Sequence, residues 1–166
     1  MSNKHKFTSS FYLDSYSIRI LKRDRKEERT LIEGIGLDLV EIDRIDRAVS
    51  RNERFARRIL STREYETYAT LQSKRRLEFL AGRFAAKEAF SKARGTGITK
   101  GCTFQDIEVL NDRAGAPVLY FHGAKTPHFI TITHTKTVAA AQVICMKGET
   151  QCTDRQWRYL AKKRSL

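Results

Sequence analysis

A glutamate in the segment Phe79–Gly97, FLAGRFAAKEAFSKARGTG, combines a residue type and a position that suggest chemistry. Glu88 continues an apolar stripe at helical spacing, which is formed by Leu77, Ala81 and Phe84. A carboxylate on such a stripe needs a partner, because burying an unpaired charge is costly. Lys92, one turn further along, would supply one through a helix ion pair, and a divalent metal ion would supply another. The spacing alone favours the ion pair.

A second carboxylate lies in residues 31–40, LIEGIGLDLV, for which the sequence predicts a strand. Asp38 has strongly apolar neighbours, and it is either a turn residue at the end of the strand or a metal ligand. Gly34 and Gly36 interrupt the strand, and glycine inside a strand often marks the close approach of another backbone or of a ligand.

Arginines recur at spacings of three and four across two predicted helices, residues 42–49 and 52–60. They are Arg44, Arg47, Arg51 and Arg54, and Phe55 stands next to them. Such a row is either a solvated charged face or a docking surface for an acidic helix. The net charge of +13 over 166 residues indicates an acidic partner, but it does not choose among nucleic acid, membrane, protein and polyphosphate.

Other features of the sequence exclude several classes of protein. The three cysteines are scattered without a CxxC pair, which argues against a zinc site and a disulfide framework and favours a reducing cytoplasm. No apolar run approaches the roughly 20 residues that span a bilayer. The phosphate-loop and dinucleotide-binding glycine motifs are both missing.

The order of predicted elements indicates a single α+β domain over residues 31–147. Ser61 and Glu64 form a capping box that opens a helix reaching about Leu71. A long helix over residues 74–94 ends in a glycine turn, whose amides beside Lys92 could hold a phosphate. The period then becomes two, which predicts strands over residues 104–110, 117–121, 129–134 and 137–146. We expect one long helix packed on a mostly antiparallel sheet.

Four stretches, taken together, resemble the holo-acyl carrier protein synthases of the phosphopantetheinyl transferase superfamily. They are GIGLDLVEIDRI (34–45), FLAGRFAAKEAFSKARGTGI (79–98), FQDIEVLNDRAGAP (104–117) and ITHTKTVAAAQV (132–143). The resemblance implies transfer of 4′-phosphopantetheine from coenzyme A to a serine of apo-acyl carrier protein, with adenosine 3′,5′-bisphosphate as the other product. It also implies a Mg²⁺-dependent, cytoplasmic homotrimer that serves fatty acid biosynthesis and binds coenzyme A between adjacent subunits.

The resemblance also implies a role for individual residues. Asp38 and Glu88 match the metal-binding carboxylates, and Lys92 matches the lysine near the pyrophosphate; these three are the expected catalytic residues. Further coenzyme A contacts fall on Arg83, Gly95, Gly97, His134 and Thr135. The surface that receives the acidic carrier protein falls on Arg44, Arg51, Arg54 and Phe55. The general base stays open between Glu88 and a water on the metal. As a lone histidine, His134 is otherwise a structural residue.

The remaining observations concern alternatives and the ends of the chain. A basic nucleic-acid-binding module is the rival from another class, but no nucleic-acid motif is present, so neither nucleic acid nor membrane is expected as a partner. The segment between Pro117 and Ile132 is shorter than in common relatives. Residues 1–30 form an extension that is either disordered or a mis-called start, with Leu31 encoded by TTG as the true initiator. Residues 148–166 form a basic tail.

Overall fold

The computed structural model describes residues 31–147, so the expectations for residues 1–30 and 148–166 lie outside the described residues. The elements, in chain order, are β1 (Ile32–Glu41), α1 (Ile42–Arg51), α2 (Phe55–Ile59), α3 (Thr62–Thr70), α4 (Ser73–Ala93), β2 (Ile107–Asn111), β3 (Pro117–Phe121), β4 (Ala124–Lys125), β5 (Phe129–His134) and β6 (Val138–Met146). Among the described helices, none has the length and apolar character that crossing a membrane requires.

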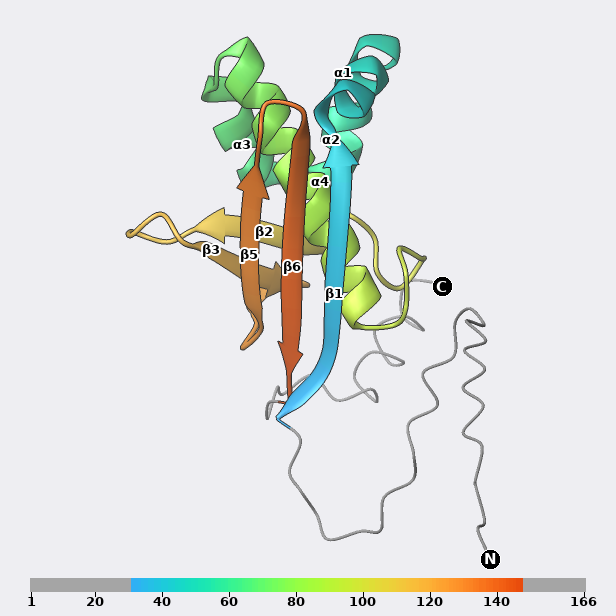
Figure 1. Ribbon diagram of the computed structural model, residues 1–166, viewed down its shortest axis with the longest axis vertical. Helices are drawn as coiled ribbons and strands as arrows, with labels where there is room; N and C mark the ends of the chain where they lie inside the picture. The colour runs from blue at the N-terminus through green and yellow to red at the C-terminus, as the bar shows by residue number, and fades with distance from the viewer. Residues whose placement is uncertain (1–30, 148–166) are drawn as a thin grey trace, which may run out of the picture.

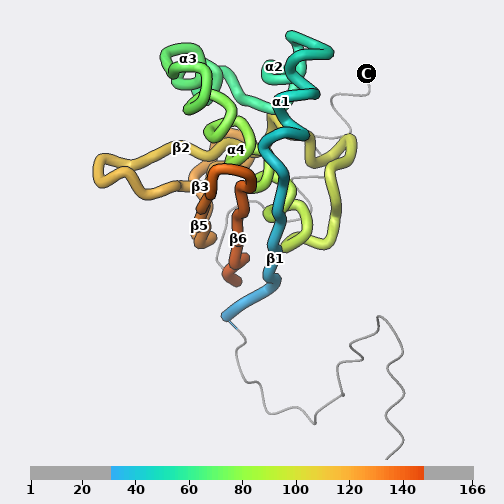
Figure 2. The backbone as a smooth tube through the Cα atoms, turned by 45° about the horizontal axis from the view of Figure 1, so that its top comes forward, coloured from blue at the N-terminus to red at the C-terminus, as the bar shows by residue number. Residues whose placement is uncertain are grey.

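The strands form two separate three-stranded sheets (Figure 1). One has the order β1-β6-β5 and the other β2-β3-β4, and every pairing in both is antiparallel. The predicted α+β class and the antiparallel pairing of β5 with β6 are therefore confirmed. The sequence led us to expect one sheet, and the structure corrects this: the β2–β3 hairpin leaves the first sheet and projects to the side (Figure 2).

Helix α4 lies behind the β1-β6-β5 sheet and is buried on most of its circumference (Figure 1). Its buried residues include Leu80, Ala81, Ala85, Ala86, Ala89 and Phe90, which belong to the hydrophobic core. The single apolar stripe expected from the sequence is thus too narrow, because β2 and α3 also pack on this helix. Alanine and glycine predominate where the helix meets the sheet, and small side chains allow close packing there.

The two glycines of β1 allow that strand to approach the backbone of α4. A Cβ atom at Gly36 would collide with the Ala89 carbonyl and lie 2.6 Å from the Ala93 nitrogen. A Cβ atom at Gly34 would collide with the Ala93 carbonyl. The expectation that these glycines mark the approach of another backbone is confirmed, and this contact sets Asp38 against the last turns of the helix.

Local hydrogen bonds explain where several elements begin and end. The predicted capping box is confirmed, because the Glu64 amide donates to Ser61 Oγ and the Glu64 carboxylate accepts from the Ser61 amide. β2 begins at Ile107 instead of the predicted Phe104, because Thr103 and Asp106 close a turn in which the Thr103 amide and hydroxyl donate to Asp106 Oδ2.

Candidate functional site

Asp38 and Lys92 meet where the middle of β1 crosses the end of α4. Asp38 shares a strand face with Gly36 and Val40, which are buried against the helix, because side chains alternate along a strand. Lys92 Nζ lies 2.7 Å from Asp38 Oδ1 and donates a longer bond of 3.4 Å to the Leu37 carbonyl oxygen. The partner of Lys92 is therefore Asp38, across the strand–helix contact.

Glu88 lies one helical turn before Lys92 and is half-buried. Burial raises the pKa of its carboxyl group above the usual value, and the nearby charge of Asp38 raises it further. Lys92 and Arg44 act on the Glu88 pKa in the opposite direction. Two carboxylates and one ammonium group thus share a small region that is partly shielded from water.

The two carboxylates fit a magnesium ion as a partial set of ligands. Within residues 31–147, no cluster of three or more histidine, cysteine or acidic side chains is placed to hold a metal. Carboxylate oxygens are the ligands that Mg²⁺ prefers, and it usually keeps several waters and takes further oxygens from substrate phosphates. Asp38 and Glu88 would hold such an ion, and water and substrate oxygens would supply its further ligands.

The amides of the glycine turn after α4 donate hydrogen bonds to carbonyl groups in the last turn of that helix. The Gly95 amide donates to the Lys92 carbonyl, and the Thr96 and Gly97 amides lie 3.3 and 3.4 Å from the Ser91 carbonyl oxygen. Gly95 and Gly97 have positive φ angles of 68° and 63°, which favour glycine at both positions. The turn is exposed and adjoins Lys92, but these amides point back into the helix end. A phosphate contact through them stays a prediction.

His134 and Thr135 lie at the opposite end of α4, in the turn between β5 and β6. His134 Nε2 accepts a hydrogen bond of 2.9 Å from Arg75 Nη1, since a guanidinium group can only donate. Glu78 accepts from the same arginine atom at 3.1 Å. Arg75 lies more than four helical turns before Lys92 on α4, but across the sheet His134 pairs with Ala139, which pairs with Val40 on β1, about 10 Å away. Within one chain, His134 therefore lies two strands from the end of β1 that carries Asp38 and does not contact the carboxylate pair.

Arg83 is buried, and its contacts hold the β2–β3 hairpin against α4. Its Nη2 donates to Asn111 Oδ1 at 2.8 Å, its guanidinium group stacks 4.3 Å from the centre of the Phe79 ring, and its Nε has no hydrogen-bond partner. Burial lowers the pKa of this guanidinium, whereas the charge of Glu64 raises it. The structure thus places Arg83 inside the fold, and a contact with coenzyme A there stays a prediction.

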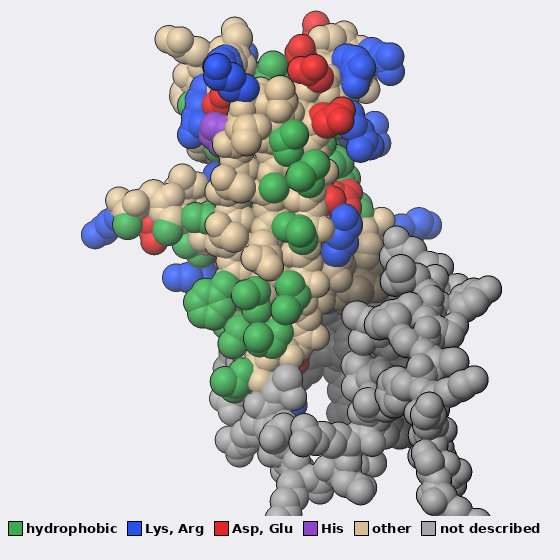
Figure 3. Space-filling view, in the orientation of Figure 1, with side chains coloured by type: hydrophobic (Ala, Val, Ile, Leu, Met, Phe, Trp, Pro, Cys, Tyr) green, Lys and Arg blue, Asp and Glu red, His purple; other side chains and the backbone are tan. Residues whose placement is uncertain are grey.

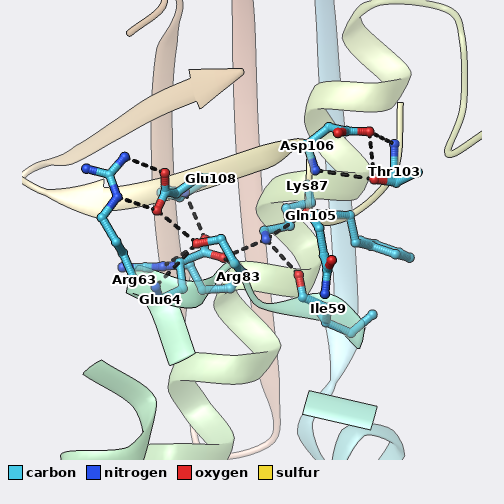
Figure 4. Close-up of polar contacts among 12 residues, drawn as sticks. Ile59, Arg63, Glu64, Arg83, Lys87, Thr103, Gln105, Asp106 and Glu108 are labelled. Carbon is cyan, nitrogen blue, oxygen red and sulfur yellow. Dashed lines mark hydrogen bonds and ion pairs between the residues drawn. The ribbon is translucent and has the colours of Figure 1, made fainter. Parts of the chain in front are cut away.

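A buried polar network around Lys87 and Glu64 was missed from the sequence (Figure 4). Lys87 Nζ donates to Glu64 Oε2 at 2.6 Å and to the carbonyl oxygens of Ile59 and Phe104 at 2.7 and 2.9 Å. Glu64 Oε1 accepts from the Val109 amide at 2.8 Å. Burial lowers the pKa of Lys87, and Glu64 opposes that shift. This network joins α2, α3, α4 and β2, and Lys87 precedes Glu88 on α4.

The basic residues of the expected docking surface are exposed, but they do not lie along one helix. Asn52 adopts an extended conformation and ends α1, so Arg54 belongs to the start of α2. The helical row of four arginines is thus interrupted between Arg51 and Arg54. Figure 3 shows Lys and Arg side chains beside α1, interspersed with acidic ones. Arg44 lies close enough to Glu88 to lower its pKa, so this surface adjoins the carboxylate pair.

A hollow of about 750 Å³ lies elsewhere, between the start of α3 and the second sheet. Its lining includes Arg57, Arg63, Tyr65 and Glu108. These groups are paired with one another, because Arg63 makes two hydrogen bonds to the Glu108 carboxylate and Arg57 stacks 4.1 Å from the Tyr65 ring centre. The hollow contains none of the residues that the sequence predicted to be functional.

Comparisons with known proteins place the chain in a family. Residues 34–147 match the 4′-phosphopantetheinyl transferase superfamily. A holo-[acyl-carrier-protein] synthase of Bacillus velezensis is 57% identical over 116 residues, which cover 69% of this chain and 95% of that protein. The enzyme of the same name from Bacillus subtilis is 51% identical over 115 residues, which cover 69% and 95%.

Solved structures give the same result. A holo-(acyl-carrier-protein) synthase of Bacillus anthracis in complex with CoA (3′,5′-ADP) is 44% identical, with a TM-score of 0.64 and coverage of 72% of this chain and all of that one. The Helicobacter pylori synthase in complex with coenzyme A is 30% identical, with a TM-score of 0.59 and coverage of 68% and 99%. From the matched residues and this shared fold, we conclude that the chain belongs to the 4′-phosphopantetheinyl transferase superfamily.

Proposed function

We propose that this protein is a holo-acyl carrier protein synthase. It transfers 4′-phosphopantetheine from coenzyme A to a serine of apo-acyl carrier protein, releases adenosine 3′,5′-bisphosphate, and supports fatty acid biosynthesis in the cytoplasm. The meeting of Asp38, Glu88 and Lys92, in a chain that is 57% identical to a synthase of this name, carries the proposal.

The roles of the three residues follow from their chemistry. Asp38 and Glu88 would hold Mg²⁺, which when bound offsets the negative charge that develops on the leaving phosphate. Lys92 stands on a flexible stem with half of its side chain exposed, so its ammonium group can reach a phosphate in front of α4. There it binds the pyrophosphate and orients it against the serine hydroxyl of the carrier protein.

The carrier protein docks on the exposed arginines beside this site. Arg44 borders Glu88, and Arg51, Arg54 and Phe55 extend the surface onto α2. Acyl carrier proteins are small and acidic, so a basic surface would steer them to the carboxylate pair. Replacement of Arg44 and Arg54 by glutamate should raise KM for the carrier protein by about tenfold or more while KM for coenzyme A stays unchanged. Equal effects on both substrates would contradict this surface.

The active form is proposed to be a homotrimer with sites shared between subunits. The open face of the β1-β6-β5 sheet exposes Ile35, Leu37, Leu39 and Phe129 by 59 to 64% (Figure 3). A cluster of exposed large apolar side chains of this kind marks an interaction site. Assembly through this face would also bring His134 and Thr135 of one subunit to the carboxylate pair of another, a pair that they do not contact within one chain.

Mass spectrometry of a carrier protein tests the proposed function directly. Apo-acyl carrier protein is incubated with the enzyme, coenzyme A and MgCl₂, and it should gain the mass of one phosphopantetheine group. The Asp38→Asn variant is the matched control, because it keeps the side-chain shape and removes the charge. Failure of the wild-type enzyme to modify any carrier protein would overturn the proposal, and full activity of Asp38→Asn would contradict the role of that carboxylate.

A further inference from the structure

The ammonium group of Lys92 lies at a position suited to a metal ion. It contacts Asp38 Oδ1 at 2.7 Å, and the Asp38 side chain is only 13% exposed. It also lies close enough to Glu88 to affect that carboxylate electrostatically. In the substrate-free chain, the single positive charge of Lys92 thus stabilises both carboxylates that are candidate metal ligands.

The need for this charge follows from the burial of the carboxylate pair. Asp38 and Glu88 are brought together where β1 packs tightly on α4, and within the described residues no third metal-ligating side chain joins them. Two neighbouring carboxylates repel each other and lose hydration when partly buried, so a nearby cation stabilises them. Lys92 can leave this position without unfolding anything, because its stem is flexible and half exposed.

We propose that Lys92 acts as an internal substitute for the divalent cation. In the substrate-free enzyme it neutralises the carboxylate pair and competes with the metal for Asp38. The pyrophosphate of coenzyme A would then draw Lys92 away and leave Asp38 to the metal, so that metal and coenzyme A bind cooperatively. This inference rests on the proposed function, because it takes coenzyme A as the ligand that moves Lys92. By linkage, each of the two ligands should raise the affinity for the other by the same factor.

Binding of Mn²⁺ to the enzyme without coenzyme A tests the competition. Free Mn²⁺ is followed by electron paramagnetic resonance, a readout that does not depend on catalysis. Lys92→Met removes the competing charge and should tighten Mn²⁺ binding about two- to fivefold, as expected for a partly exposed ion pair. Lys92→Arg keeps the charge and should bind Mn²⁺ as the wild type does. Lys100→Met removes a charge from an exposed lysine beyond the glycine turn and corrects for the general loss of positive charge.

The outcomes separate this inference from the proposed function. Mn²⁺ binding by Lys92→Met that is absent, unchanged, weaker, or no tighter than in Lys100→Met would overturn the competition. Saturating coenzyme A, after correction for Mn²⁺ bound to free coenzyme A, should tighten Mn²⁺ binding more in the wild type than in Lys92→Met. An equal gain in both proteins would overturn the coupling. Loss of the proposed function would show instead as a wild-type enzyme that binds Mn²⁺ and modifies no carrier protein.

Discussion

Lys87 is a fully buried cation whose replacement tests the polar part of the core. Its three donors are all used, by the Glu64 carboxylate and by two backbone carbonyls. Lys87→Met should lower the free energy of unfolding by about 3–5 kcal/mol, because it leaves the buried Glu64 carboxylate without its closest cation. Urea unfolding followed by circular dichroism measures this change.

The double variant Lys87→Met with Glu64→Gln is the control for charge. The glutamine is neutral and still offers an oxygen to the Val109 amide, so the double variant should be more stable than Lys87→Met alone. If the double variant is less stable than Lys87→Met, the uncompensated charge of Glu64 is not the main reason for the loss of unfolding free energy in Lys87→Met.

The candidate site shows which residues can be found from sequence. Glu88 and Asp38 stand out because a carboxylate among apolar residues needs an explanation, and the structure places both beside Lys92. Glu64 does not stand out, because its capping box already accounts for it locally. Its second partner, Lys87, lies 23 residues further along the chain. Pairing over that separation depends on how α3 packs on α4, which the spacing of apolar residues does not determine.

At the scale of elements, the contact between β1 and α4 depends on a glycine. Gly36→Ala would place a methyl group against the Ala89 carbonyl. The methyl group is fixed to the backbone of β1 and the carbonyl belongs to the backbone of α4, so neither can move away without a shift of the strand or the helix. We expect a loss of roughly 3 kcal/mol in the free energy of unfolding, together with displacement of Asp38 from Lys92. Thermal unfolding and the transfer assay should both detect the change.

Gly82→Ala is the matched control for this contact. Gly82 lies on α4, and the added methyl group would meet only Cγ2 of the Ile132 side chain, at 3.1 Å, where a shift of a few tenths of an ångström relieves the contact. Gly82→Ala should lower the free energy of unfolding clearly less than Gly36→Ala does, because alanine also has a higher helix propensity than glycine. Equal losses in the two variants would contradict the idea that the β1–α4 contact is exceptionally tight.

His128, which precedes β5, leads us to expect that the stability of the first sheet depends on pH. Its Nδ1 accepts a hydrogen bond of 3.2 Å from the Met146 amide, and burial, followed by the charge of Arg94, lowers its pKa. The neutral form is thus favoured by folding. Its contribution to stability is complete above the unfolded pKa of about 6.5 and is lost as the pH falls below that value.

His128→Asn tests this dependence, because the asparagine oxygen can accept from the Met146 amide and does not titrate. The loss of unfolding free energy between about pH 7 and pH 5 should be smaller in the variant than in the wild type. If the wild type and the variant show identical pH profiles in urea unfolding, the pKa of His128 does not differ between the folded and the unfolded protein.

The elements themselves were largely predictable, whereas their assembly was not. Periodicity and capping residues place α4 at Ser73–Ala93, close to the predicted 74–94, and the alternation of residues identifies β3, β5 and β6. The alternation of apolar and polar residues predicts which face of a strand is buried, but it does not predict which strand lies beside it. The division into two sheets therefore emerged only from the structure, and β4, with two residues, is too short to show a period.

At the scale of the whole molecule, the separation of His134 from Glu88 makes a prediction about assembly. If each site takes its carboxylates from one subunit and His134 and Thr135 from the next, two inactive variants can complement each other. Glu88→Gln and the pair His134→Ala with Thr135→Ala should each have little transfer activity as pure proteins. Trimers formed by refolding an equal mixture should regain about a quarter of the wild-type activity, because each interface then has an even chance of receiving each intact half.

Light scattering establishes whether the mixed protein is a trimer, so that lost assembly is not mistaken for lost complementation. A mixture of separately folded trimers that are not allowed to exchange subunits is the control, and it should stay inactive. Sites contained within one chain would each lack one of the two halves in every mixed trimer, and the refolded mixture would then be as inactive as its components. Recovery of activity would therefore show that two subunits complete each site, and it would support the proposal that the subunits assemble through the exposed face of the β1-β6-β5 sheet.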